Sequence, residues 1–313
     1  MSLKSQVALV TGASRGIGKG IAVSLGEAGA TVYVTGRRPE IAEKLSNSST
    51  LQQVADEINR KGGKGIAVYC DHSNPQDVKE LFERIDKEQQ GQLDILVNNA
   101  YSAVSFLMKR IGKKFYELEE SPEEVWDTVN NVGLRNYYIC SVYATRMMIK
   151  RKAGLIVNIG SMGGLKYMFS VSYGAGKDAK DRMAADIAHE LQGTGITCVS
   201  VWPAAVKTEY MLENVVNGKN DALSKAFAAG EDLGYAGRGI AKLAADPNKD
   251  RFNGKILLTA DLAETYDIRG EDGKIHRPSE LEERKRIVEI INDIRTSGVK
   301  REYQVKTQFL GAI

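Results

Sequence analysis

Histidine and cysteine are scarce, since the 313-residue chain contains three of each. The histidines are scattered and lack the spacing of zinc ligands, so the sequence predicts no metal site. Cys70, Cys140 and Cys198 lie far apart, each within an apolar run. We therefore interpret them as reduced thiols of a buried core, which suits a reducing compartment and argues against a disulfide framework.

Long hydrophobic runs and a large excess of one charge are also missing. No apolar segment is long enough to span a bilayer, and the first residues lack the apolar stretch and cleavage site of a signal peptide. The formal net charge is +3 and the basic residues are evenly spread, which argues against a nucleic-acid partner. We expect an intracellular, cytoplasmic globular protein.

The chain is rich in short apolar runs that alternate with longer helical patterns. Seven runs contain mostly valine and isoleucine with little alternation, as in strands buried on both faces. They cover residues 7–11, 31–35, 65–70, 94–98, 155–159, 197–202 and 255–259. Helical patterns lie near 17–28, 49–61, 75–89, 122–151 and 174–192. This order predicts an α/β fold, with a doubly wound, Rossmann-type, seven-stranded parallel sheet and helices on both faces.

A further helix is predicted after the last strand. Pro278 and Ser279 can begin it, Glu282 can complete its capping box, and Gly298 can end it. We therefore divide the chain into a Rossmann-type domain over residues 1–262 and a helical C-terminal extension over 263–313. The extension is expected to pack on that domain or on a subunit partner.

The first predicted strand runs directly into TGASRGIGKG, in which Gly12, Gly16 and Gly18 precede a helix. Glycines let the backbone turn tightly and approach a pyrophosphate, and the helix N-terminus supplies N–H donors. In this position between a first strand and a first helix, the glycines predict a dinucleotide site rather than a tight turn alone.

The residues after the second predicted strand indicate which dinucleotide binds. An acidic residue there usually holds a free ribose 2′-hydroxyl. The sequence is instead VTGRR, with Arg37 and Arg38, and Arg15 in the glycine loop adds a positive charge. Arginine binds a 2′-phosphate through paired charged hydrogen bonds, so we expect NADP(H) rather than NAD(H). The alternative is that these arginines are surface residues with no role.

Several motifs, in the same order along the chain, resemble the short-chain dehydrogenase/reductase family over residues 4 to 262. They are the TGxxxGxG loop (Thr11, Gly12, Gly16, Gly18), the NNA segment (Asn98, Asn99, Ala100) and the YxxxK pair (Tyr173, Lys177). Ser161 resembles the catalytic serine of the family, and Asp71 resembles its adenine-contacting acid. Pro203 and Thr208 resemble its PGxxxT segment.

The resemblance implies a nicotinamide cofactor held mainly by the residues that follow the strands. The implied cofactor-binding residues are Gly12, Ser14, Arg15, Gly16, Ile17, Gly18, Arg37, Arg38, Asp71, Asn98, Ala100, Tyr173, Lys177, Pro203, Val206 and Thr208.

The resemblance also implies catalytic roles for Ser161, Tyr173 and Lys177. Tyr173 and Lys177 are four residues apart and share one helix face. A lysine ammonium nearby favours tyrosinate and lowers the pKa of the phenol from its usual value of about 10. Tyr173 would protonate a carbonyl oxygen as hydride arrives, Lys177 would hold the ribose hydroxyls and relay the proton, and Ser161 would donate a hydrogen bond to the same oxygen.

Three features depart from the family pattern. Gly133 stands where the family usually has an asparagine that supports a water of the proton relay. Its carbonyl, or Asn130 or Asn136 on roughly the same face, could take over that role. Tyr101 replaces the glycine that usually follows NNA. The loop before Tyr173 is one residue shorter than is common.

The substrate pocket is expected between the loop after Ser161 and the long connections over residues 101–121 and 209–238. Its candidate lining residues are largely apolar: Tyr101, Phe106, Leu107, Met108, Leu165, Tyr167, Met168, Phe169, Met211 and Leu212. They predict a lipophilic ketone or aldehyde such as a steroid or retinoid, unless they pack in the core or a subunit interface instead.

The sequence thus predicts an NADP(H)-dependent carbonyl reductase or alcohol dehydrogenase. One alternative is an NADP(H)-binding sensor or scaffold with little turnover, because of Gly133. Another is an epimerase or dehydratase on the same scaffold. The family usually forms dimers or tetramers, so a homo-oligomer is expected. The segments VNNVGLRNYY and YMFSVSYGAGK and the long tail indicate one subgroup of the family, which leaves association with an internal membrane open.

Overall fold

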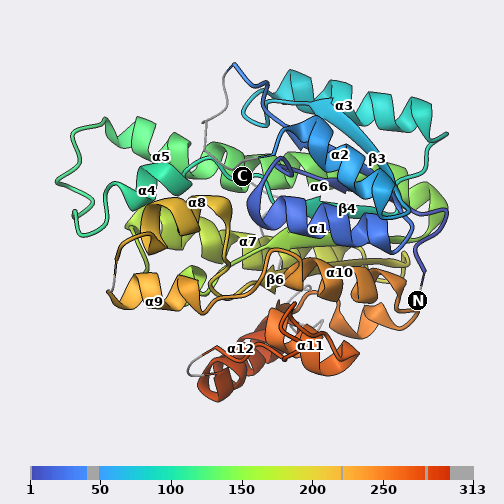
Figure 1. Cartoon of the computed structure of the whole chain (residues 1–313). Helices are drawn as coiled ribbons and strands as arrows, with labels where there is room; N and C mark the ends of the chain where they lie inside the picture. Colours follow the sequence, from blue (N-terminus) through green and yellow to red (C-terminus); the bar gives the residue numbers. More distant parts are fainter. Residues whose placement is uncertain (1, 41–48, 220, 279–280, 297–313) are drawn as a thin grey trace, which may run out of the picture.

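The computed structural model describes residues 2–40, 49–219, 221–278 and 281–296. Seven parallel strands in this part of the chain form one sheet, in the order β3-β2-β1-β4-β5-β6-β7 (Figure 1). They are β1 (Val7–Val10), β2 (Thr31–Gly36), β3 (Lys64–Tyr69), β4 (Ile95–Asn98), β5 (Gly154–Ile159), β6 (Ile196–Trp202) and β7 (Ile256–Leu258). The predicted doubly wound α/β fold is confirmed.

The central strands are apolar because both of their faces are covered. Every residue of β1, β4, β5 and β6 is buried, whereas the edge strand β3 is partly exposed. The strand order reverses between β1 and β4, which pair in register from Ala8 and Ile95. The loops that follow these two strands therefore diverge and leave a crevice at the carboxyl edge of the sheet.

Helices cover both faces of the sheet. One core cluster joins the strands to α1 (Gly16–Glu27), α2 (Leu51–Arg60) and α10 (Tyr235–Ala245). A second cluster joins them to α3 (Pro75–Glu88), α6 (Asn136–Arg151) and α7 (Val171–Glu190). Cys70, Cys140 and Cys198 are free and buried in the second cluster, as predicted.

The sequence predicts one helix over residues 122–151, but the structure interrupts it. Residues Asn131–Arg135 form a π-helical turn between α5 (Pro122–Asn130) and α6. The buried Gly133 lies in the middle of that turn. Its lack of a side chain lets the widened backbone approach the residue that follows the NNA segment, and such turns are frequent at functional sites.

The two long connections form short helices that gather at one end of the sheet (Figure 1). The first contains α4 (Val104–Met108). The second contains α8 (Glu209–Met211), a π-helical turn over Leu212–Val216, and α9 (Ala222–Ala228).

After β7 the chain forms α11 (Thr259–Tyr266) and α12 (Leu281–Thr296). The side-chain amide of Asn292 in α12 pairs with the backbone of Ile256 in β7: Nδ2 donates to its carbonyl at 2.9 Å, and Oδ1 accepts from its N–H at 2.7 Å. The expected helix boundaries at Ser279 and Gly298 lie outside the described residues. The domain division at residue 262 stays a prediction, because α11 crosses it without a break.

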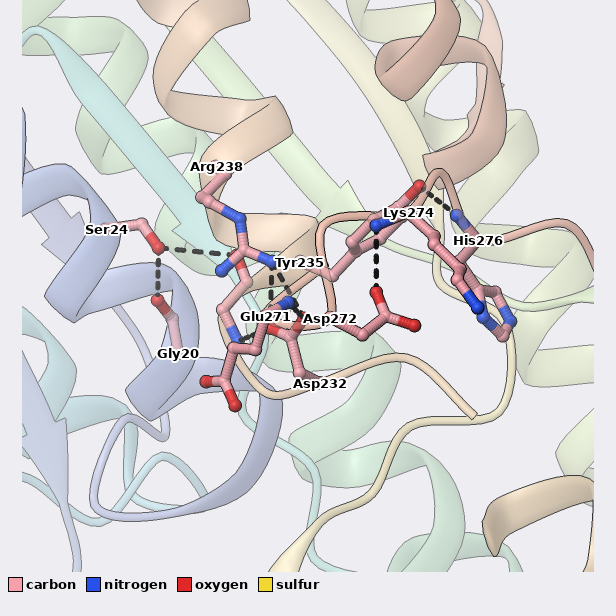
Figure 2. Close-up of polar contacts among 10 residues, drawn as sticks. Gly20, Ser24, Asp232, Tyr235, Arg238, Glu271, Asp272, Lys274 and His276 are labelled. Atoms are coloured by element: carbon pink, nitrogen blue, oxygen red, sulfur yellow. Dashed lines mark hydrogen bonds and ion pairs between the residues drawn. The ribbon is translucent and has the colours of Figure 1, made fainter. Parts of the chain in front are cut away.

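The segment between α11 and α12 is held against α10. Figure 2 shows Asp232 between Arg238, whose guanidinium is 2.8 Å away, and the N–H of Glu271, which donates at 3.1 Å. The N–H of His276 donates to the hydroxyl of Tyr235 at 2.9 Å. No helix among the described residues is long and apolar enough to cross a bilayer.

Candidate active site

The glycine loop is shaped by its contact with the end of β4. Gly12 and Gly16 have φ angles of +65° and +57°, in the region that favours glycine. A Cβ at Gly12 would lie 2.7 Å from Cα of Ala100, so the loop must approach that strand closely. Asn99 fixes the approach, because its Nδ2 donates to the carbonyls of Thr11 and Gly12, both at 2.9 Å.

A cavity of about 1070 Å³ opens where the strands end. It is lined by residues that follow each of the strands β1 to β6, so it lies in the crevice at the carboxyl edge of the sheet. Most predicted site residues line it: Gly12, Ser14, Arg15, Gly16, Ile17, Gly18, Arg37, Asp71, Ala100, Ser161, Tyr173, Lys177, Pro203, Val206 and Thr208.

Two predicted cofactor-binding residues do not line the cavity. The side chain of Asn98 is fully buried, and its Nδ2 donates to Oγ of Ser141 at 3.0 Å and to Oδ1 of Asn158 at 2.9 Å. Asn98 therefore ties β4 to α6 and β5, and its neighbour Asn99 faces the cavity. Arg38 is not among the lining residues, and its guanidinium lies 5.7 Å from the ring centre of Tyr69, which is one of them.

Three side chains with complementary chemistry meet deep in the cavity. The hydroxyl of Tyr173 donates to Oγ of Ser161 at 3.0 Å, although the loop between them is short. Lys177, one helical turn further along α7, places Nζ 5.6 Å from the ring centre of Tyr173 and 3.5 Å from the carbonyl of Ile159. Ser170 caps α7 by accepting the N–H of Tyr173 at 3.2 Å, which fixes the start of this helix.

Aromatic and apolar side chains lie around Ser161, Tyr173 and Lys177. Phe169 meets the ring of Tyr173 edge-on at 5.1 Å between centres, and Tyr101 does so at 6.3 Å. Six predicted pocket residues line the cavity: Tyr101, Leu107, Met108, Met168, Phe169 and Met211. Leu223 and Phe227, both in α9, also line it. Four predicted ones do not line it: Phe106, Leu165, Tyr167 and Leu212.

The C-terminal extension also reaches the cavity, which the sequence did not indicate. His276, Arg277, Pro278 and Arg284 are among its lining residues. They lie beyond the part of the chain that carries the family motifs, so no motif pointed to them.

Tyr101 and Gly133, the residues at which the chain departs from the family pattern, lie against each other. A Cβ at Gly133 would lie 2.5 and 2.6 Å from Cδ2 and Cε2 of Tyr101. Lys180 lies beneath the same ring, with Nζ 5.0 Å from its centre. Neither asparagine considered as a substitute lines the cavity. Asn130 donates to the carbonyl of Ser172 at 3.2 Å, and Asn136 contacts Nδ1 of His72 at 3.2 Å.

Two carboxyl groups that the sequence analysis missed contact residues that line the cavity. Oε2 of Glu209 accepts the N–H of Gly16 at 2.8 Å, at the N-terminus of α1. Oε1 of Glu231 accepts the N–H of Ala204 at 3.2 Å and the hydroxyl of Thr259. Burial raises the pKa of Glu231 to about 7.

The residues present fit a nicotinamide dinucleotide. Arg37 and Asp71 line one part of the cavity, the N-terminus of α1 another, and Tyr173 and Lys177 a third. The backbone N–H groups and dipole of α1 favour an anionic phosphate. Gly12, Gly16 and Gly18 line the cavity without side chains, so a pyrophosphate can approach the backbone of the loop.

Comparison with known proteins agrees with this geometry. Residues 6–218 match the family model described as short chain dehydrogenase. The human protein named Dehydrogenase/reductase SDR family member 1 is 46% identical over 278 residues, which covers 87% of this chain and 85% of that protein. It represents the subgroup that VNNVGLRNYY and YMFSVSYGAGK indicated.

Two further relatives carry names that mention a cofactor. The NADPH-dependent aldehyde reductase-like protein, chloroplastic, of Arabidopsis thaliana is 31% identical over 267 residues, 82% of this chain and 93% of that protein. A metagenomic short-chain oxidoreductase, solved in complex with NADP, matches with a TM-score of 0.63 at 27% identity, over 82% of this chain and 97% of that one. These names are those of oxidoreductases, and they do not favour a sensor or scaffold.

Proposed function

Because the chain belongs to the short-chain dehydrogenase/reductase family, we propose that it is an NADP(H)-dependent oxidoreductase acting on a lipophilic ketone or aldehyde. The observation that carries this proposal is the contact of 3.0 Å between Tyr173 Oη and Ser161 Oγ, with Lys177 beside them in a large cavity. An oxygen atom that binds between two such hydroxyls can receive a hydrogen bond and a proton at once.

Each residue of this group has a distinct role in carbonyl reduction. The nicotinamide supplies the hydride when it is bound. Ser161 holds the substrate oxygen by donating its hydroxyl hydrogen, and Tyr173 transfers its phenolic proton to that oxygen as negative charge develops there. The ammonium of Lys177 stabilises the tyrosinate that remains. The reverse steps oxidise an alcohol.

The preference for NADP(H) is supported by the charge around the second strand. Arg15 and Arg37 line the cavity, and Gly36 and Arg37 stand where an acidic residue would hold a free ribose hydroxyl. A phosphate on the ribose would gain charged hydrogen bonds there, whereas an acidic residue would repel it.

A lipophilic substrate is supported by the walls around Tyr173. Leu107, Met108, Met168 and Phe169 belong to the apolar cluster around Tyr173, and with Met211 they line the same cavity. Methionine side chains adapt to irregular apolar shapes, which suits bulky and varied carbonyl compounds.

We also propose a homo-oligomer, because Trp126 of α5 and Tyr138 of α6 are large and about half exposed.

The test is NADPH oxidation by the purified protein, followed by absorbance, with apolar ketones and aldehydes and with charged keto acids. We expect faster turnover of the apolar compounds, and a higher kcat/KM with NADPH than with NADH. Faster turnover of keto acids would refute the substrate class, and a preference for NADH would refute the cofactor assignment.

A further inference from the structure

A second lysine lies buried behind the acid–base group. Lys180 follows Lys177 by three residues on α7, so the two side chains lie on the same face of the helix. Lys180 is 1% exposed, which is rare for lysine. Its Nζ lies between two aromatic rings, 5.0 Å from the centre of Tyr101 and 4.5 Å from that of Tyr137.

The amine of Lys180 has no acceptor to stabilise a positive charge. Its Nζ has no hydrogen-bond partner in the described part of the chain. The Nζ of Lys177 lies over the same ring of Tyr101, 5.2 Å from its centre, so both amines adjoin one ring. Burial and the neighbouring Lys177 ammonium lower the pKa of Lys180 well below its usual value.

The charged and titratable groups around Lys180 come from three elements. On α7 they are Lys177 and Asp181, whose carboxylate accepts from Ser200 and from Trp202 on β6. The segment after β4 contributes Tyr101, and α6 contributes Tyr137. The two ring faces and the carboxylate of Asp181 favour a cation, but burial, the lack of an acceptor and the nearby ammonium oppose it more strongly.

The position of Lys180 coincides with the gap in the family pattern. A Cβ built on Gly133 would lie 3.8 Å from Nζ of Lys180 and would point into the ring of Tyr101. The region behind Lys177 that the family fills with an asparagine and a water is therefore filled here by an aromatic ring and an amine.

We propose that Lys180 is a positioning residue of the acid–base site, whose neutral amine accepts a hydrogen bond from the ammonium of Lys177. This contact holds Lys177 toward Tyr173 in place of the relay water. The inference rests on the proposed oxidoreductase function, and it adds a residue that the family motifs do not contain.

The first test compares pH profiles of kcat for wild type, Lys180→Met and Lys180→Gln. Methionine has a similar length but removes the acceptor, so turnover at pH 8.5 should fall about tenfold, the effect of losing a hydrogen bond to a charged group. Its alkaline decline should begin at lower pH. Glutamine keeps an acceptor oxygen and should restore much of the profile.

Lys87→Met, on the exposed side of α3, is the control for the substitution itself. A Lys180→Met profile that coincides with wild type would overturn the proposal.

The second test does not depend on activity. An amine that is neutral when folded and charged when unfolded makes the unfolded chain bind more protons, so wild-type stability rises with pH in this range. Lys180→Met removes that penalty, so its Tm should exceed that of wild type most at pH 6. The difference should shrink as the pH approaches about 10.4, the usual pKa of lysine.

A Tm difference that is constant with pH would show that Lys180 is charged in the folded protein and would refute the neutral amine. If the wild type turns over no carbonyl compound, the proposed function fails, while this measurement still decides the state of Lys180.

Discussion

The ring of Tyr101 fills the space that a side chain at Gly133 would need, since a Cβ at Gly133 would lie 2.5 Å from Cδ2 of that ring. Two departures from the family pattern are thus one feature of the structure. Where the family usually has a side chain in this turn and a glycine after NNA, this chain has Gly133 in the turn and the ring of Tyr101 after NNA.

This exchange predicts coupling between the two positions. Gly133→Asn in the wild-type background should destabilise the protein by about 1–3 kcal/mol, because the core has no room for the added atoms. In the Tyr101→Gly background the same change should cost much less or stabilise the protein. Urea unfolding of the four proteins gives the coupling energy, which we expect to be at least about 1 kcal/mol. Additive effects would contradict the exchange.

Arg37 should determine the preference for the cofactor phosphate. Arg37→Ala should weaken NADPH binding about tenfold or more and leave NADH binding nearly unchanged, because only NADPH carries the 2′-phosphate. Arg38→Ala is a matched control, since that arginine does not line the cavity. Fluorescence titration with both nucleotides measures the effect. Equal losses for the two arginine variants would show that general surface charge, and not Arg37, selects the cofactor.

Glu209 should compete with the cofactor phosphates. Its carboxylate accepts the N–H of Gly16 at the N-terminus of α1, where a pyrophosphate is expected. Glu209→Gln removes one negative charge from this region and should tighten NADPH binding by about three- to tenfold. Glu83→Gln on the exposed face of α3 controls for net charge. Weaker binding by Glu209→Gln would mean that the carboxylate supports the bound cofactor through another contact.

Glu231 should make stability depend on pH. Its folded-state pKa of about 7 lies above the usual value of about 4.3, so the folded protein binds the extra proton between these values. The stability contributed by that proton is present below about pH 4.3 and is lost as the pH rises through about 7. Glu231→Gln should therefore match wild type most closely near pH 4 and gain in Tm relative to it toward pH 8. Parallel Tm curves would contradict a protonated Glu231.

The parts of the site that the sequence predicted are those fixed by local geometry. A strand, a turn and a helix determine the backbone of the glycine loop, and one helical turn brings Tyr173 and Lys177 to the same face. The sequence could not decide which of two adjacent asparagines faces the cavity, because residues at a strand end alternate between faces. Asn99 faces it, and Asn98 is buried.

Contacts between distant segments were also beyond the sequence. The carboxylate of Glu209 accepts the N–H of Gly16, although the two residues are 193 positions apart in the sequence. The loop that carries Glu209 shows no helical or strand periodicity from which this contact could be predicted. Lys180 was missed for a different reason. Its spacing from Tyr173 and Lys177 places it on their helix face, but lysine is usually solvated, so a buried position was not expected.

Tyr173→Phe tests the central claim most directly, because it removes one hydroxyl group and preserves the ring packing against Phe169. The variant should still bind NADPH, as fluorescence titration would show, and its carbonyl-dependent NADPH oxidation should fall by about 100-fold or more. If the variant binds NADPH and turns over carbonyl compounds at the wild-type rate, Tyr173 is not the acid and the proposed mechanism is wrong.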